Sequence, residues 1–330
     1  MMSIVSTAPA PTERKTASIR NLPVNLFASV IGLAGLSIAW RQASHEFGVS
    51  PIVANGAGLL AFAAFFALSA GYLMKWVKHP DAVMGEYQHP IVGNFFGTIF
   101  IGMLLLSAVA APVSAPLAEI IWTIASLATL TLCFAISSRL LRGQIDVTHV
   151  APAWFIPGVA TLDIAVTGGD MPMAWAHEVN LFALAIGTVI ALLFFTMIMA
   201  RIIHHAPLPS GMVPSLLILM APFEVGFLAY GSLLHRIDTF SAMLFYFGLF
   251  IFLTLAPKVF RGGIPFTTSW WSISFPMAVL AIAALKYSMF VQAWPMKAIA
   301  AILLALLSLA IAVLLVRTLR HLATGKLLAG

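Results

Sequence analysis

The segment TTSWWSISFPMAVLAIAALKYS, residues 267–288, carries a proline inside a long apolar run. Pro276 directly follows Phe275. A proline in the interior of an α-helix removes a backbone hydrogen bond and clashes with the preceding turn, which costs about 3 kcal/mol or more in a soluble helix. We therefore expect a feature of the fold to offset this cost.

The composition is that of a membrane protein. Of the 330 residues, 61% are hydrophobic and 8% are charged, whereas a soluble chain carries about 25% charged residues. Lipid must therefore surround most of the surface. The single cysteine, Cys133, excludes an intrachain disulfide. Basic residues stand singly or in pairs between apolar stretches, not gathered on one polar face, so nucleic acid is not an expected partner.

Ten stretches have the length that a helix needs to cross the hydrocarbon core, about 20 mostly apolar residues. We expect an all-α fold of ten transmembrane helices within residues 23–320, between cytoplasmic tails at 1–22 and 321–330. The expected spans are 23–41, 52–77, 90–111, 115–138, 152–168, 174–203, 212–234, 239–257, 264–287 and 295–318.

The loop charges predict the orientation. Thirteen basic residues fall on the side of the termini: Arg14, Lys15, Arg20, Lys75, Lys78, Arg139, Arg142, Arg201, Lys258, Arg261, Arg317, Arg320 and Lys326. Four fall on the other side: Arg41, Arg236, Lys286 and Lys297. Cytoplasmic loops carry the excess of Lys and Arg. Both termini are therefore expected in the cytoplasm, in a multi-pass protein of the bacterial inner membrane.

Prolines divide the spans into two classes. Pro90, Pro152 and Pro214 begin the third, fifth and seventh spans at intervals of 62 residues, while Pro157, Pro222 and Pro276 lie within odd-numbered spans. Broken helices are tolerated in membranes only where protein or a water-filled cavity surrounds them. This distribution predicts five kinked odd-numbered helices around a central pathway. The alternative is that such prolines are merely commoner in membrane helices.

Four motifs resemble the tellurite-resistance and dicarboxylate transporter family. They are GEYQHP at 85–90, HVAPAWFIP at 149–157, LILMAPFEVGFLAY at 217–230 and WWSISFPMAVLAIAALKYS at 270–288. The family includes bacterial TehA proteins, fungal malate permeases and the slow anion channels of plant guard cells. The resemblance implies five tandem helical hairpins, an inner ring of odd-numbered helices around a pore, and a homotrimer with one pore per subunit.

The resemblance also implies a gate. In the family a phenylalanine on the ninth helix, just ahead of the kink, plugs the pore, and SISFPMAV places this plug at Phe275, with Pro276 as the kink. A glycine that often faces the gate from the first helix is replaced by Ala28, with Gly32 one turn later. A bulkier lining is implied.

The distribution of charges indicates which class of solute the expected pathway would favour. By the predicted spans no Lys or Arg lies at mid-membrane, so we expect no fixed positive site. Anion preference would come from helix dipoles and from a basic cytoplasmic mouth, favouring small monovalent anions. The expected mouth residues are Arg139, Arg142, Arg201, Lys258 and Arg261. His204 and His205 have no carboxylate or cysteine partner in the sequence, so neither a metal nor another cofactor is expected.

Two carboxyl groups lie within predicted spans, and such groups are functional by default. Asp163 and Glu224 admit three interpretations: hydrogen-bonded structural acids, a proton relay, or groups that tune selectivity near a mouth. Since Glu224 follows Pro222 on an inner helix, it is the one expected to touch the pathway. Pro157 and Pro222 are further candidates for the lining.

Two functions compete. The first is a gated pathway for small anions, plugged by Phe275. The alternative is a proton-coupled transporter of C4-dicarboxylates or other weak acids. An intramembrane enzyme is disfavoured, because the sequence has neither a nucleophile with its base nor a metal motif such as H-E-x-x-H.

Overall fold

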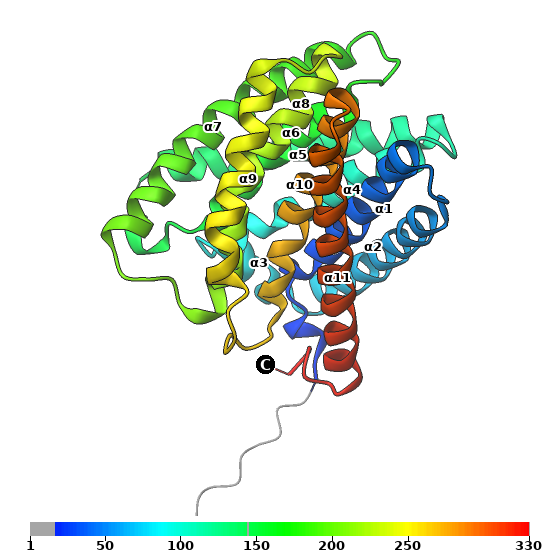
Figure 1. Ribbon diagram of the computed structural model, residues 1–330. Coiled ribbons are helices and arrows are strands. Elements are labelled where there is room, and N and C mark those ends of the chain that lie inside the picture. The colour runs from blue at the N-terminus through cyan, green and yellow to red at the C-terminus, as the bar shows by residue number, and fades with distance from the viewer. Residues whose placement is uncertain (1–16, 144, 330) are drawn as a thin grey trace, which may run out of the picture.

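The computed structural model describes residues 17–143 and 145–329, so most of the expected N-terminal tail lies outside the described residues. The described chain is helical, with one isolated backbone bridge between Ala17 and Ala329 (Figure 1). The helices are α1 (Ala28–Phe47), α2 (Ile52–Lys78), α3 (Pro80–Gln88), α4 (Gly97–Ala110), α5 (Ala115–Leu141), α6 (Phe155–Gly168), α7 (Ala176–His204), α8 (Ala221–Leu234), α9 (Thr239–Val259), α10 (Ser274–Val291) and α11 (Trp294–Ala323).

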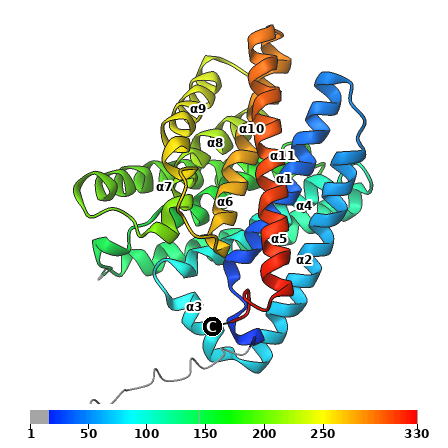
Figure 2. The ribbon, with the colours of Figure 1, turned by 60° about the horizontal axis from the view of Figure 1, so that its bottom comes forward.

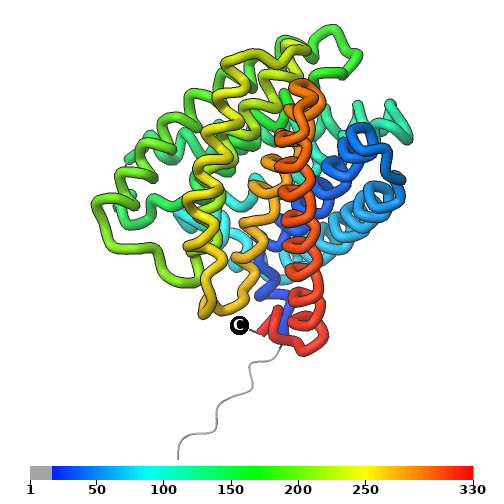
Figure 3. The backbone as a smooth tube through the Cα atoms, viewed as in Figure 1, coloured from blue at the N-terminus to red at the C-terminus, as the bar shows by residue number. Residues whose placement is uncertain are grey.

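Consecutive long helices pack as hairpins: α1 with α2, α4 with α5, α6 with α7, α8 with α9, and α10 with α11. The described ends of the chain meet, since the backbone N–H of Ser18 donates to the carbonyl of Leu328 at 3.1 Å (Figure 3). We call this end of the bundle the terminal face and the other end the opposite face. The short helix α3, which the sequence did not predict, lies at the terminal face (Figure 2).

Burial separates two sets of helices. In the described residues nine helical segments are long and apolar enough to span a membrane; four are 61% to 89% buried and five are 17% to 39% buried. The buried four contain α1, α4, α8 and α10, and nearly every residue of the shorter α6 is also buried. We call these five the inner helices and α2, α5, α7, α9 and α11 the outer helices. The expected all-α membrane fold is confirmed; a membrane crossing by the 14-residue α6 stays a prediction.

Each inner α-helix follows a short 3₁₀ segment. These segments are Val24–Phe27, Val92–Phe96, Pro152–Trp154, Ser210–Met220 and Thr268–Ile273. A 3₁₀ turn has poorer hydrogen-bond geometry than an α-turn, and hydroxyl groups supplement it. Ser29, Thr98 and Ser274 each donate to the carbonyl three residues earlier, at 2.6 to 2.7 Å. Neither the 3₁₀ segments nor these bonds were expected from the sequence.

The inner-helix prolines stand at these transitions. Pro157, Pro222 and Pro276 are each the second or third residue of an α-helix. Pro222 and Pro276 are therefore internal to the continuous helical segments Ser210–Leu234 and Thr268–Val291, at the change from 3₁₀ to α geometry. A proline N cannot donate to the preceding turn, so each proline stands where the regular hydrogen-bond pattern is interrupted. The cost raised by Pro276 is offset by its place at this change of geometry inside the bundle.

Helices α1 and α10 approach closely through glycine. A Cβ atom at Gly35 would lie 2.6 Å from the Cβ of Ala278, and one at Gly32 would lie 2.7 Å from the Cβ of Ser274. The hydroxyl of Ser274 also lies 3.1 Å from the carbonyl oxygen of Ala28. Small residues at helix contacts are what let backbones meet in membranes. This contact fixes α10 against α1 next to Phe275.

Buried Lys75 joins the terminal-face end of α2 to its surroundings. Its ammonium donates to the carbonyl of Leu22 at 2.8 Å and pairs with Glu86 of α3 at 2.9 Å. The hydroxyl of Tyr72 donates to Glu86 at 2.6 Å. Lys75 is 1% exposed, so this residue, counted above among the loop cations, contributes no free charge to the surface.

Replacing Gly35 with alanine tests the close contact. We expect Gly35→Ala to lower stability by about 1–3 kcal/mol, because the added methyl group overlaps Ala278. Gly56 of α2 has no atom within 4 Å of an added Cβ, so Gly56→Ala should leave stability equal or raise it by up to about 1 kcal/mol. Thermal unfolding in detergent compares the two. Equal shifts would show that α1 and α10 do not meet at Gly35.

Candidate functional site

Phe275 faces a small cavity at the centre of the bundle. The cavity measures about 30 Å³, and its lining comes from all five inner helices and from the 3₁₀ segments before α4, α8 and α10: Ala28, Ile31, Phe95, Thr98, Ile101, Ile156, Val159, Ile218, Ala221, Trp271, Ser272, Phe275 and Pro276. The Phe275 side chain is 9% exposed. A space of this size holds about one or two water molecules. It has no room for an ion with a hydration shell.

Hydrogen bonds fix the backbone that carries the Phe275 ring. The neighbouring Ser274 hydroxyl lies between the carbonyl oxygens of Trp271, at 2.7 Å, and Ala28, at 3.1 Å. The indole of Trp271 is fully buried and donates to the hydroxyl of Thr318 on α11 at 2.8 Å. Residues on both sides of the α10 start are thus tied to α1 and α11.

A larger cavity opens toward the opposite face. This cavity, which we call the vestibule, measures about 300 Å³ and is lined by all five inner helices together with α5. Its polar and charged lining residues are Ser37, Arg41, Gln42, Glu119, Asp163, Thr167, Asp170 and Lys286. Apolar residues such as Leu105, Val109, Leu228, Val279 and Ile282 complete the wall.

On α10 and α6, the residues that line the two cavities lie on one face of each helix. On α10 the small cavity is lined by Phe275 and the vestibule by Val279, Ile282 and Lys286, at spacings of four, three and four residues. Residues at such spacings share one face of a helix. On α6 the lining runs in the same way, through 156, 159, 163 and 167. Each of these helices therefore presents one continuous stripe to an axis that passes Phe275 and widens into the vestibule.

The two carboxyl groups occupy different places. Asp163 is fully buried and lines the vestibule, whereas Glu224 lines neither cavity on the axis. The Glu224 carboxyl group lies against Gly248 of the outer helix α9, where an added Cβ would overlap its Oε1. Neither carboxyl group has a hydrogen-bond partner among the described residues. The structure thus reverses the expected order, because Asp163, not Glu224, faces the axis.

The other residues predicted to line the pathway lie in different places in the structure. Ala28 and Pro276 line the small cavity beside Phe275. Gly32 faces Ser274 and Ile311 at a helix contact instead. Pro222 lines a hollow between α6, α7, α8 and α9 away from the axis. Pro157 lines none of the cavities described above. The prolines set the helix starts, while smaller and aliphatic residues form most of the lining.

The five predicted mouth cations are of two kinds. Arg139 donates to the carbonyl of Tyr87 at 2.7 Å, and Arg201, 7% exposed, donates to the carbonyl of Ala206 at 2.8 Å. Arg142, Lys258 and Arg261 are exposed. Within residues 17–143 and 145–329, none of the five lines the small cavity. At the terminal face Arg139 thus binds the end of α3, and Arg201 binds the loop that follows α7.

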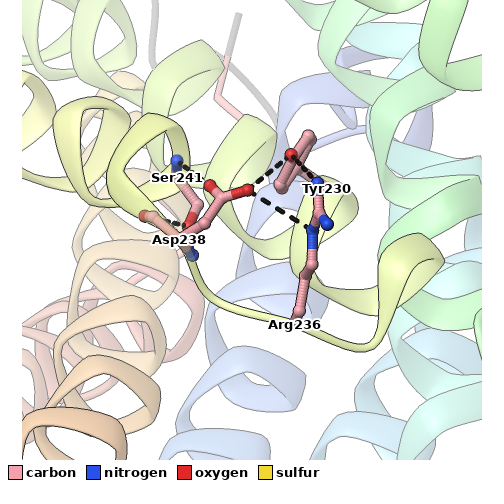
Figure 4. A network of polar contacts seen from close by, with 4 residues as sticks. All are labelled: Tyr230, Arg236, Asp238 and Ser241. Atoms are coloured by element: carbon pink, nitrogen blue, oxygen red, sulfur yellow. Dashed lines mark hydrogen bonds and ion pairs between the residues drawn. The ribbon is translucent and has the colours of Figure 1, made fainter.

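A polar network lies beyond the vestibule at the opposite face (Figure 4). Asp238 accepts hydrogen bonds from the backbone N–H of Ser241 at 3.1 Å and the hydroxyl of Tyr230 at 2.8 Å, and its carboxylate lies 3.4 Å from Arg236. These donors, with Arg236, hold the pKa of Asp238 below its usual value. Asp238 therefore stays ionised at neutral pH and balances the charge of Arg236.

Sequence reasoning missed two cations of the vestibule. Arg41 and Lys286 were assigned to the ends of spans or to loops, but they lie inside α1 and α10 and line the vestibule. For Lys286 the sequence does contain a signal. Lys286 follows Phe275 by eleven residues, a spacing that places both on the same helical face, about 16 Å apart along the helix.

The geometry defines a multi-pass membrane protein in which buried inner helices enclose two cavities. The family described as SLAC1, voltage-dependent anion channel, matches residues 21–319, and the chain belongs to this family. The resemblance drawn from the four motifs is thereby confirmed. It is a family of anion channels and transporters, which gives no support to an enzyme.

Individual relatives agree with this assignment. The S-type anion channel SLAH3 of Arabidopsis thaliana is 26% identical over 320 residues, which cover 94% of this chain and 50% of the relative. The guard cell S-type anion channel SLAC1 of the same plant is 25% identical over 323 residues, covering 94% and 58%. The tellurite resistance protein TehA homolog of Haemophilus influenzae is 24% identical over 271 residues, covering 81% of each chain. The chain spans about half the length of SLAH3.

Cysteine labelling tests whether the two cavities differ in access to water. Thr167 is partly exposed in the vestibule, whereas Thr98, 3% exposed, lines the small cavity. In a Cys133→Ala background, we expect Thr167→Cys to react with a charged methanethiosulfonate at least about tenfold faster than Thr98→Cys, since buried sites react only through rare opening. Mass spectrometry measures both rates. Equal rates would mean that the axis is not closed near Phe275.

Proposed function

We propose that this protein is a membrane pathway for small anions, closed by the phenyl ring of Phe275. The observation that supports the proposal most is the position of this ring. It faces a cavity of about 30 Å³ enclosed by all five inner helices, on the axis that leads to the vestibule. The chain's membership of an anion channel and transporter family supports the solute class.

The helix starts supply a physical basis for anion preference. The small cavity is lined by the first or second residue of every inner α-helix: Ala28, Thr98, Ile156, Ala221 and Phe275. A helix N-terminus carries a partial positive charge. Here each start continues a 3₁₀ segment whose carbonyls accept the first α-helical N–H, as the N–H of Ala221 donates to Ile218, so five such ends around one point attract an anion only weakly, without a fixed cation. The apolar side chains around it keep binding weak, as rapid conduction requires.

The same field should let anions of low charge cross more readily than anions of high charge. Removing an ion from water becomes more costly as its charge rises, and helix dipoles provide only partial charges in return. Small monovalent anions such as chloride or nitrate should therefore cross more readily than strongly hydrated dianions. We propose these monovalent anions as the solutes.

Orientation and assembly complete the proposal. We place the terminal face in the cytoplasm of a bacterium and the protein in its inner membrane, on the thirteen-to-four distribution of basic residues. We also propose a homotrimer with one pathway per subunit, on the resemblance alone. The outer helices expose apolar residues over much of their length, so lipid surrounds whatever the subunits leave uncovered.

The place of Asp163 favours a second candidate function, a proton-coupled transporter of dicarboxylates or other weak acids. Asp163 lines the vestibule with both carboxyl oxygens buried and unpartnered among the described residues. An ionised carboxyl group in such a place is costly, whereas the neutral acid is less so. A change of solute or of water access could therefore make the group take up or release a proton.

Removal of the Phe275 ring tests the pathway. We expect Phe275→Ala to raise the chloride or nitrate current in planar bilayers at least about tenfold, which corresponds to about 1.4 kcal/mol of barrier. Phe250→Ala is the control, because Phe250 is 59% exposed on the outer helix α9. Equal and negligible currents in the wild type and both variants would reject a plugged channel.

A pair of neutralised carboxyl groups tests proton coupling. If Asp163 carries the proton, Asp163→Asn abolishes uptake of a weak acid driven by a pH gradient in proteoliposomes, while Glu224→Gln, buried equally but away from the axis, retains it. Gradient-driven uptake that survives Asp163→Asn would contradict this second candidate. Reconstituted protein is quantified in each sample to exclude differences in insertion.

A further inference from the structure

The basic residues of the opposite face differ in how they are balanced. Arg236 pairs with Asp238 at 3.4 Å and Lys297 pairs with Glu46 at 3.2 Å. Arg41 donates to the side-chain oxygen of Asn55 at 3.3 Å through one terminal nitrogen. Lys286 has neither a hydrogen bond nor an ion pair with any of the described residues.

Arg41 leaves part of its guanidinium available as well. Its second terminal nitrogen, Nη1, is buried and has no hydrogen-bond partner in the described chain. Both Arg41 and Lys286 line the vestibule. A buried N–H group without a partner is costly. The vestibule therefore holds two sets of N–H donors whose hydrogen bonds can be completed by an acceptor that enters from solution.

Lys286 lies where two hollows meet. Besides the vestibule, it lines a hollow of about 580 Å³ that also contains His235 and Arg236. The two spaces share Gln42, Leu228 and Lys286. Asp238 balances Arg236, whereas Lys286 forms no ion pair with a described residue and is attracted at longer range by the carboxylate of Asp170. An anion that comes from the opposite face meets Lys286 before it reaches the apolar part of the axis.

Carboxyl groups of the vestibule compete with an anion for Lys286, and their surroundings differ. Asp170 is exposed to solvent, and Glu119 is partly exposed. Charges in contact with water are strongly screened. Asp163 is fully buried without a donor, where the neutral acid costs less than the carboxylate. None of the three forms an ion pair with Lys286.

We propose that Lys286, with Nη1 of Arg41, forms an anion-binding site in the vestibule for a small monovalent inorganic anion. The inference rests on the proposed function, because the site precedes the Phe275 plug on the same face of α10. A lysine ammonium is a compact charge with three donors and a flexible stem. It can hold a hydrated ion such as chloride at the entrance and release it toward the constriction.

The site is tested by the concentration dependence of conduction. In the Phe275→Ala background, Lys286→Met should raise the half-saturating chloride concentration on the opposite face by about three- to tenfold, the range expected for one partly exposed charge interaction. Lys286→Arg should restore it in large part. Lys297→Met is the matched control, because it removes the same charge from the same face, outside both hollows.

Binding is measured separately, on the complete chain with Phe275 intact. Chloride-35 line broadening in detergent should decrease in Lys286→Met and stay unchanged in Lys297→Met, with size-exclusion profiles as a check of folding. If Lys286→Met matches Lys297→Met in line broadening, the site is rejected. If Phe275→Ala carries no current but Lys286→Met alone loses line broadening, the plugged channel is rejected and the anion site stands.

Discussion

The structure depends on one constraint of the hydrocarbon environment: every backbone polar group must find its partner inside the protein. The five inner helices change from 3₁₀ to α geometry within the bundle, at the point where hydrogen bonding is weakest. Outer helices cover these transitions, and the hydroxyls of Ser29, Thr98 and Ser274 bond to carbonyls there. Because the transitions coincide at the small cavity, irregular backbone and the proposed gate occupy the same place in the molecule.

Close contact between α1 and α10 links this backbone geometry to Phe275. Gly32 and Gly35 leave room for Ser274 and Ala278, and the Ser274 hydroxyl lies at 3.1 Å from the carbonyl of Ala28. The residue after Ser274 is the phenylalanine that faces the cavity. On the proposed function, opening then requires rotation of the ring within a fixed backbone or separation of two tightly packed helices. Rotation of the ring disturbs fewer contacts.

The sequence predicted much of the fold because lipid leaves few alternatives. Composition identified the membrane class, and the confinement of prolines to odd-numbered spans identified the buried helices. The positions of Pro157, Pro222 and Pro276 in a first α-turn could not be predicted, since a 3₁₀ segment before them has the same apolar composition. The reversal of Asp163 and Glu224 has another cause. Which side of an inner helix faces the axis depends on the rotation of that helix about its own axis. An inner helix is apolar on nearly every side, so its sequence does not indicate this rotation.

In this protein the number of basic residues on a face does not predict how much free charge that face offers to a solute. The terminal face has most of the basic residues, yet Lys75, Arg139 and Arg201 donate to backbone carbonyls and serve the fold. The opposite face has four, of which Arg236 and Lys297 form ion pairs. On the proposed function, the field along the axis arises from a small number of groups: the five helix starts at the constriction, the Lys286 ammonium three turns away, and Arg41, which lines the same vestibule. On the proposed function, weak and separated attractions of this kind let an anion move forward without being trapped, as conduction requires.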